Sequence, residues 1–123
     1  MKQILIVEDE AVLRKVYETL FTLEKFTVCV AENGQAALDE LKNFKPDIII
    51  LDLLMPIMGG VEFLSVANLE KTHPATKVLV LSNLSDAETI SHITELGATK
   101  YLLKAGISPR ELVGTVNEMI KKT

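Results

Sequence analysis

Cysteine, proline and glycine are scarce in this sequence. Its 123 residues include one cysteine, four prolines and six glycines. A single cysteine can form neither an internal disulfide nor a cysteine metal cluster. Because Cys29 stands in the apolar run Val28–Val30, we expect it to be a small buried hydrophobic residue. The low glycine and proline content argues against disorder, and the length suits one domain, residues 1–123.

An excess of basic charge and long apolar runs are also missing. The formal net charge is −4, which provides no basic surface for a phosphate backbone, so we expect no direct nucleic-acid binding. The apolar run Ile48–Leu51 is ended by Asp52, far short of a membrane span. The N-terminus reaches Glu8 and Asp9 without the apolar segment and cleavage site of a signal peptide. We therefore expect a cytoplasmic protein with no membrane contact.

Five short apolar runs recur along the chain, and three of them are continuously apolar. Continuous runs are typical of strands buried on both faces. Amphipathic helical patterns lie between the runs, and this alternation predicts parallel strands joined by helical crossovers. The expected strands are Ile4–Val7, Thr27–Val30, Ile48–Leu51, Val78–Leu81 and Tyr101–Leu103.

Helix-start signals agree with this alternation. Asn33 and Gly34 precede the second helical pattern, and Ser108 with Pro109 precedes the last, where Ser108 and Glu111 fit a capping box. We therefore predict an α/β fold of the (βα)5 doubly wound, flavodoxin-like type. Its five-stranded parallel sheet has the order 2-1-3-4-5, with helices on both faces.

Polar residues follow four of the expected strands at their carboxyl ends. Glu8 and Asp9 follow the first, Asp52 the third, Ser82 the fourth and Lys104 the fifth. Ligands of doubly wound sheets bind beyond this edge. Clustered carboxylates repel one another unless a cation intervenes, and Mg²⁺ suits a site with few oxygen ligands and several waters. A carboxylate, a metal and an ammonium together favour transfer of a phosphoryl group to the carboxylate.

These motifs, over essentially the whole chain, resemble the receiver domain of bacterial two-component response regulators. The residues of this chain that match the family pattern are Glu8-Asp9, Asp52 followed by Pro56 and Gly60, Ser82, and Lys104 preceded by Tyr101. The resemblance implies that Asp52 is the phosphorylated aspartate and Asp9 a direct Mg²⁺ ligand. It also implies that the Leu54 backbone carbonyl binds the metal, that Glu8 reaches it through water, and that Lys104 binds the phosphoryl group.

The resemblance further implies a conformational switch. Ser82 would turn its hydroxyl toward the phosphoryl group, and Tyr101 would rotate into the space that this opens. The output face would be formed by the fourth helix, the fifth strand and the fifth helix. Expected partners are a sensor histidine kinase or phosphotransfer protein, a downstream target or output domain, and a second copy in a phosphorylation-dependent homodimer. Such a protein catalyses its own phosphorylation and dephosphorylation but turns over no metabolite.

Several residues depart from the family pattern. Lys104 is followed by Ala105 where the family has proline in a cis bond, so we expect a trans bond with an altered loop or a cis bond under strain. Asn83 replaces a small residue, and its amide either narrows access to the phosphoryl group or bonds within the loop. Leu54 and Leu84 flank the path of the attacking water in the family, so here they predict a long-lived phosphoryl group.

Two other functions fit the same fold. A flavin or nucleotide module would need a phosphate-binding loop after the first strand, where this chain has Glu8-Asp9-Glu10. A degenerate receiver would act as an interaction module without phosphorylation, and the altered Ala105 and Asn83 keep that alternative open. His73 and His92 have no partner at metal-ligand spacing and are expected at the surface.

Overall fold

Five parallel strands form the centre of the structure. The computed structural model describes residues 2–121, so residues 1, 122 and 123 of the expected domain lie outside it. The strands pair in the order β2-β1-β3-β4-β5, which confirms the predicted doubly wound topology. Their bounds are β1 (Gln3–Val7), β2 (Thr27–Ala31), β3 (Ile48–Leu51), β4 (Lys77–Ser82) and β5 (Lys100–Leu103).

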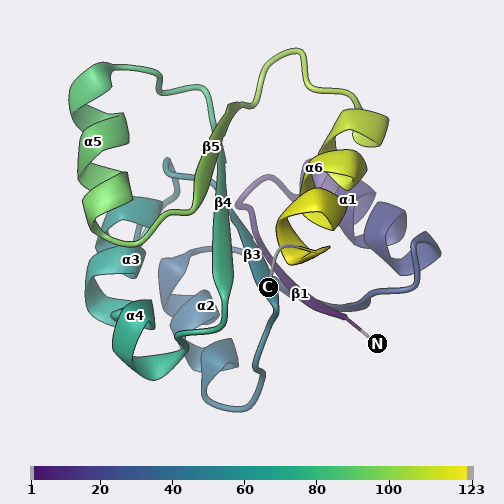
Figure 1. Cartoon of the computed structure of the whole chain (residues 1–123), viewed down its shortest axis with the longest axis horizontal. Helices are drawn as coiled ribbons and strands as arrows, with labels where there is room; N and C mark the ends of the chain where they lie inside the picture. The colour runs from purple at the N-terminus through teal and green to yellow at the C-terminus, as the bar shows by residue number, and fades with distance from the viewer. Residues whose placement is uncertain (1, 122–123) are drawn as a thin grey trace.

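Helices cover both faces of this sheet (Figure 1). α1 (Ala11–Leu23) and α6 (Pro109–Lys121) lie on one face. The other face carries α2 (Gly34–Leu41), α3 (Gly60–Ala67), α4 (Leu69–Thr72) and α5 (Ala87–Glu95). Among residues 2–121 no helix is both long and apolar enough to cross a membrane.

Helix α4 was not expected, because the apolar spacing predicted a single helix between β3 and β4. Asn68 adopts the left-handed conformation, with φ 48° and ψ 54°, and ends α3. A new turn of helix then begins at Leu69. Asparagine enters this region at lower cost than most residues, so one residue divides the segment into two helices.

The pleat of the strands separates the core into two layers. Leu5 and Val7 of β1 pack under α2, α3 and α5, whereas Ile4 and Ile6 pack under α1 and α6. All residues of β3 are buried, as expected for a central strand covered on both faces. The continuous apolar runs predicted as central strands therefore occupy the centre of the sheet.

Side-chain caps confirm two helix starts. The side chain of Asn33 accepts a hydrogen bond from Ala36 N at 2.8 Å, at the start of α2. Ser108 and Glu111 exchange two hydrogen bonds of 3.1 Å at the start of α6, which is the predicted capping box.

Cys29 is half-buried rather than buried, so the expectation of a simple core residue was wrong. It lies on edge strand β2, and its thiol donates a hydrogen bond of 2.9 Å to Oε2 of Glu40. Burial and the neighbouring Glu40 carboxylate raise the pKa of the thiol to about 12. The thiol therefore stays protonated near neutral pH and is a poor nucleophile.

Candidate functional site

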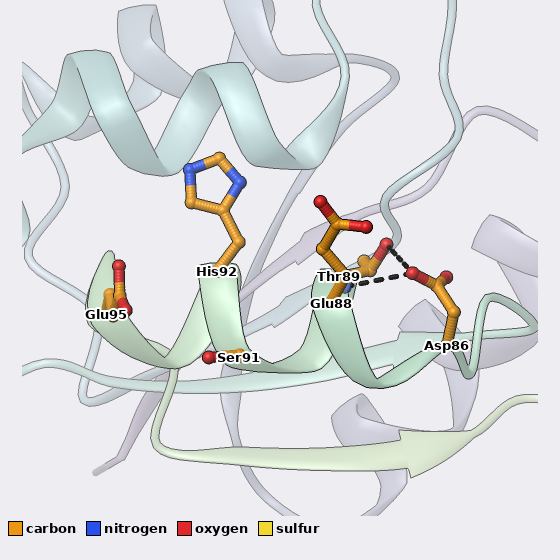
Figure 2. Close-up of a pocket in the computed structure, with 6 residues that line it drawn as sticks. All are labelled: Asp86, Glu88, Thr89, Ser91, His92 and Glu95. Atoms are coloured by element: carbon orange, nitrogen blue, oxygen red, sulfur yellow. Dashed lines mark hydrogen bonds between the residues drawn. The ribbon is translucent and has the colours of Figure 1, made fainter.

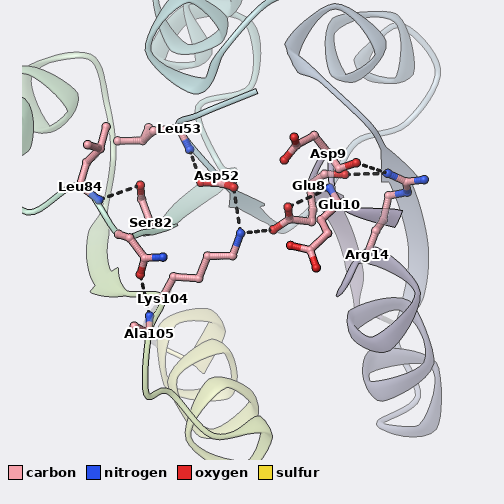
Figure 3. Close-up of polar contacts among 11 residues, drawn as sticks. Glu8, Asp9, Glu10, Arg14, Asp52, Leu53, Ser82, Leu84, Lys104 and Ala105 are labelled. Atoms are coloured by element: carbon pink, nitrogen blue, oxygen red, sulfur yellow. Dashed lines mark hydrogen bonds and ion pairs between the residues drawn. The ribbon is translucent and has the colours of Figure 1, made fainter. Parts of the chain in front are cut away.

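The carboxyl ends of β1 and β3 bring three carboxylates together. Val7 is in register with Leu51, and Asp52 N donates to Val7 O at 3.1 Å, so Glu8 and Asp52 leave the sheet side by side. One carboxylate oxygen from each of Glu8, Asp9 and Asp52 lies within 4.8 Å of the other two. Figure 3 shows these side chains converging with Lys104. The carboxylates expected at these strand ends are therefore brought together.

Lys104 bridges two of these carboxylates. Its Nζ lies 2.7 Å from Oε1 of Glu8 and 2.9 Å from Oδ2 of Asp52. Burial by itself would lower the pKa of Lys104, but the hydrogen bonds and charges of Glu8 and Asp52 outweigh burial and raise that pKa. The ammonium therefore remains charged at physiological pH and offsets part of the negative charge of the clustered carboxylates.

Glu8 is the most buried member of the acidic cluster, with 3 % of its surface exposed. Its Oε2 accepts a hydrogen bond of 3.1 Å from Glu10 N, while Oε1 pairs with Lys104. Burial raises the pKa of Glu8, and the contacts with Lys104 and Glu10 only partly counteract it. The direct pairing of Glu8 with Lys104 was not anticipated from the sequence.

Asp52 is held in place by its own loop. It is 7 % exposed, and its Oδ1 accepts a hydrogen bond of 2.7 Å from Leu53 N. Leu53 O in turn accepts from Gly60 N at 2.9 Å. A Cβ at position 60 would lie 2.5 Å from the carbonyl oxygen of Asp52, so this close approach requires glycine. The loop thus fixes the carboxylate that faces Lys104.

Arg14 holds the segment that carries Glu8 and Asp9, a role that was not predicted from the sequence. Its Nη1 donates to the backbone carbonyl oxygens of Glu8 at 2.8 Å and Asp9 at 3.4 Å, from the first turns of α1. A cation at this position steadies the segment that carries two of the carboxylates. In the sequence, Arg14 is a single basic residue five positions after Asp9. This spacing alone does not distinguish a residue that binds the loop from a solvent-exposed charge.

Ser82 and Tyr101 take no part in the ion pairs of Lys104 with Glu8 and Asp52. Ser82 is buried, and its Oγ accepts a hydrogen bond of 3.3 Å from Leu84 N. The Tyr101 hydroxyl donates to Leu84 O at 2.7 Å and lies 3.3 Å from Ser82 O. Both residues therefore contact the loop that follows β4, where the expected switch would operate.

The Lys104–Ala105 peptide bond is trans, the first of the two expected arrangements, and residues 2–121 contain no cis bond. Lys104 nevertheless reaches Asp52, so proline is not needed to place it. Ala105 N donates to Oδ1 of Asn83 at 2.8 Å. The Asn83 amide therefore bonds to the loop after β5, and not within its own loop as one of the two expected roles had it.

The two leucines that were expected to exclude water differ in environment. Leu54 is 63 % exposed, two residues after Asp52. Leu84 is partly buried and packs against the same core layer as Tyr101. The backbone carbonyl of Leu54 belongs to the loop that follows Asp52, and its role as a Mg²⁺ ligand stays a prediction.

A different pocket lies on the outer face of α5. It has a volume of about 490 Å³ and is lined by Asp86, Glu88, Thr89, Ser91, His92 and Glu95 (Figure 2). The Asp86 side chain there accepts hydrogen bonds from the amide and hydroxyl of Thr89, at 3.0 and 2.7 Å. His92 is exposed and His73 half-exposed. Among residues 2–121, the only group with metal-ligand geometry is Glu8, Asp9 and Asp52.

Fold and site together define a receiver domain, and comparison with known proteins agrees. The family model described as the response regulator receiver domain matches residues 4–117. The chain therefore belongs to this family, whose members are signalling domains of two-component systems rather than metabolic enzymes.

Individual relatives support this assignment. Transcriptional regulatory protein LnrK of Bacillus subtilis is 35 % identical over 85 % of this chain and 47 % of its own length. CpxR of Escherichia coli is 32 % identical over 100 % of this chain and 51 % of its own length. The chain thus spans about half of these regulators. Chemotaxis protein CheY of Thermotoga maritima is 29 % identical, and 98 % of each chain is covered.

Solved structures share the fold over nearly the whole chain. A CheY-like receiver domain protein from Methanospirillum hungatei superposes with a TM-score of 0.91 at 24 % identity, covering 99 % of this chain and 95 % of its own. Chemotaxis protein CheY4 of Vibrio cholerae gives a TM-score of 0.88 at 26 % identity, with 96 % and 98 % covered. The sheet order and helix placement are therefore those of receiver domains.

Proposed function

We propose that this receiver domain accepts a phosphoryl group on Asp52 in a Mg²⁺-dependent reaction. The observation that carries the proposal is the convergence of Asp52 with Glu8, Asp9 and Lys104 in one cluster of charged side chains. An oxygen of the Asp52 carboxylate attacks phosphorus, the bond from phosphorus to the donor breaks, and an acyl phosphate remains on Asp52. The donor would be a phosphohistidine of a sensor histidine kinase or of a phosphotransfer protein.

The chemistry of the donor set fits Mg²⁺. The three clustered side chains offer only carboxylate oxygens, the ligands that this ion prefers. Asp9, Asp52 and the Leu54 carbonyl would hold it directly, and Glu8 through water. When bound, Mg²⁺ would offset negative charge on the phosphoryl oxygens.

The residues of the chain have separate tasks in this proposal. Leu53 N holds one oxygen of Asp52, so the carboxylate has a defined orientation. The Lys104 ammonium, 2.9 Å from the other oxygen, is near enough to pair with a phosphoryl group added there. Water could later hydrolyse the acyl phosphate, and we propose that Leu54 and Leu84 slow this step. The domain would thus catalyse only its own modification.

The loop after β4 would transmit the conformational change. Ser82 would exchange its bond with Leu84 N for one with the phosphoryl group, and Tyr101 holds the same loop through Leu84 O. The change would reach α5, β5 and α6, which are the fourth helix, fifth strand and fifth helix expected from the sequence. A downstream protein, an output domain or a second copy would bind there. We propose a cytoplasmic location and no direct contact of these 123 residues with nucleic acid or membrane.

Incubation with Mg²⁺ and acetyl phosphate or beryllofluoride tests the proposal. We expect the intact mass to increase by one phosphoryl group with acetyl phosphate, and amide signals around the pocket to shift with beryllofluoride. Asp52→Asn should abolish both responses, and so should a chelator. Asp39→Asn, on the exposed side of α2, is the matched control and should respond as the wild type does. An unmodified wild-type protein would favour the degenerate receiver. An undiminished response of Asp52→Asn would show that another residue is modified, and it would contradict the proposal as well.

A further inference from the structure

Two hydrogen bonds tie the loop after β5 to the end of β4 and the loop that follows it. Lys104 N donates to the backbone oxygen of Ser82 at 3.0 Å. The next amide, Ala105 N, donates to the side-chain oxygen of Asn83 at 2.8 Å. Figure 3 shows this second bond at Ala105, at the base of the Lys104 side chain. The peptide unit that follows Lys104 is therefore anchored by a side chain from another loop.

This anchor depends on two features of the chain. An N–H is available at position 105 only because the residue there is not proline. An acceptor is available only because residue 83 has an amide side chain, which alanine or glycine lacks. The two features are complementary, since each provides half of one hydrogen bond.

The position of the Lys104 ammonium depends on the position of the backbone that carries it. Lysine places its charge at the end of a flexible four-carbon chain, and here the ammonium must reach Oε1 of Glu8 and Oδ2 of Asp52 together. A fixed backbone at positions 104 and 105 limits the directions in which this chain extends. Tyr101 holds the partner loop from the other side, through Leu84 O.

We propose that Asn83 is a positioning residue for Lys104. Its side-chain oxygen holds the trans Lys104–Ala105 peptide so that the ammonium stays aimed at the carboxylate pocket. The effect of Asn83 on phosphorylation rests on the proposed function, because Lys104 then acts on the phosphoryl group. Its effect on the loop and on the ammonium does not depend on phosphorylation.

Nuclear magnetic resonance of the unphosphorylated protein gives the first test. In Asn83→Ala, the Ala105 amide proton should shift upfield and exchange faster with solvent, and the ammonium signal of Lys104 should broaden. Asn83→Asp keeps an acceptor and should restore the Ala105 amide. Asn117→Ala, an exposed asparagine of α6, should change neither signal. Unchanged Ala105 and Lys104 signals in Asn83→Ala would overturn the proposal.

The rate of phosphorylation by acetyl phosphate gives the second test. Asn83→Ala should lower the maximal rate by about two- to tenfold, the range expected for one net hydrogen bond. The Mg²⁺ concentration at half-maximal rate should stay the same, because Asn83 is not one of the clustered carboxylates. In an Ala105→Pro background the same substitution should have no further effect, since the N–H is absent.

The outcomes separate the two proposals. If the wild type accepts no phosphoryl group, the proposed function fails, while the amide and ammonium signals still decide the role of Asn83. If the Ala105 amide responds but the Lys104 ammonium signal does not, Asn83 links the loops without positioning Lys104, and the inference is wrong. An equal loss of rate in the Ala105→Pro background would show that Asn83 acts by another route.

Discussion

The ammonium nitrogen of Lys104 lies 2.7 Å from Oε1 of Glu8, in the pocket proposed for Mg²⁺. One cation of the protein thus already balances charge where a second cation would bind. Unit charges about 4 Å apart interact by roughly 4 kcal/mol at an effective dielectric constant of about 20. We therefore expect Lys104 to oppose Mg²⁺ binding electrostatically, although under the proposed function it would assist phosphoryl transfer.

Replacing this lysine should separate its two effects. Lys104→Met should raise the affinity for Mg²⁺ by about tenfold, equivalent to ~1.4 kcal/mol, because the competing cation is lost. The same variant should be phosphorylated more slowly by acetyl phosphate. Calorimetric titration with MgCl₂ measures the first effect. Lys100→Met, at an exposed lysine of β5, controls for the change in net charge. Equal Mg²⁺ affinities of Lys104→Met and wild type would contradict this prediction.

The burial of Glu8 predicts a pH dependence of stability. Its pKa in the folded protein is raised above the ordinary value of 4.5, chiefly by burial. The folded state therefore binds this proton more tightly than the unfolded state does. The stability that Glu8 contributes is complete below its unfolded pKa and is lost as the pH rises through the raised pKa.

Glu8→Gln removes this titration. The free energy of unfolding of the wild type, minus that of Glu8→Gln, should fall as the pH rises from the ordinary pKa of 4.5 through the raised pKa of the folded protein, by ~1.4 kcal/mol for each unit of pKa shift. Urea unfolding of both proteins in the absence of Mg²⁺, at a series of pH values, measures this difference. Glu62→Gln, in the exposed first turn of α3, is the control for neutralising a carboxylate. A difference that stays constant or rises with pH would show that burial does not dominate at Glu8.

Leu54 and Leu84 should prolong the life of the phosphoryl group on Asp52. Together, Leu54→Asn and Leu84→Glu should accelerate hydrolysis by about tenfold, a barrier change of ~1.4 kcal/mol, because polar side chains admit and orient water. Leu54→Asn alone is the cleaner test, because Leu54 is exposed whereas Leu84 packs on the core. Decay of phosphorylated protein is followed after removal of acetyl phosphate. The control is Leu23→Asn, an exposed leucine at the end of α1, and an unchanged decay rate in the double variant would refute the role.

The hydroxyl of Tyr101 should stabilise the loop after β4. Tyr101→Phe removes its hydrogen bond to Leu84 O and should lower the free energy of unfolding by about 1 kcal/mol. If this loop transmits the signal, the variant should still be phosphorylated, but beryllofluoride should shift fewer amides in α5. Chemical denaturation and amide spectra measure the two effects. A normal α5 response would leave Tyr101 as a packing residue.

Ile57 has an unfavourable backbone conformation beside the site. Its φ is 69°, in the left-handed region, and the residue is 81 % exposed. Branched residues are costly there, whereas asparagine is tolerated. Ile57→Asn should therefore raise the free energy of unfolding by about 1 kcal/mol. Val66→Asn, at an exposed helical position of α3, should produce no such gain. Thermal and urea unfolding would detect it, and a loss of stability would contradict the assigned conformation.

Much of the fold followed from local patterns in the sequence. Continuous apolar runs such as Ile48–Leu51 are compatible with few structures besides buried parallel strands, and the caps at Asn33 and Ser108 depend on residues three positions away. Because parallel strands present their carboxyl ends at one edge, the positions of Glu8, Asp52 and Lys104 at strand ends were sufficient to predict a common pocket.

Only the tertiary structure decided which groups pair there. The bonds of Lys104 with Glu8, of Arg14 with two backbone carbonyls and of Asn83 with Ala105 join separate elements. Local sequence determines helical period, strand burial and caps, since these involve neighbouring residues. Contacts between distant loops depend on where the packed sheet and helices place those loops, so the sequence determined the members of the site and the fold determined their partners.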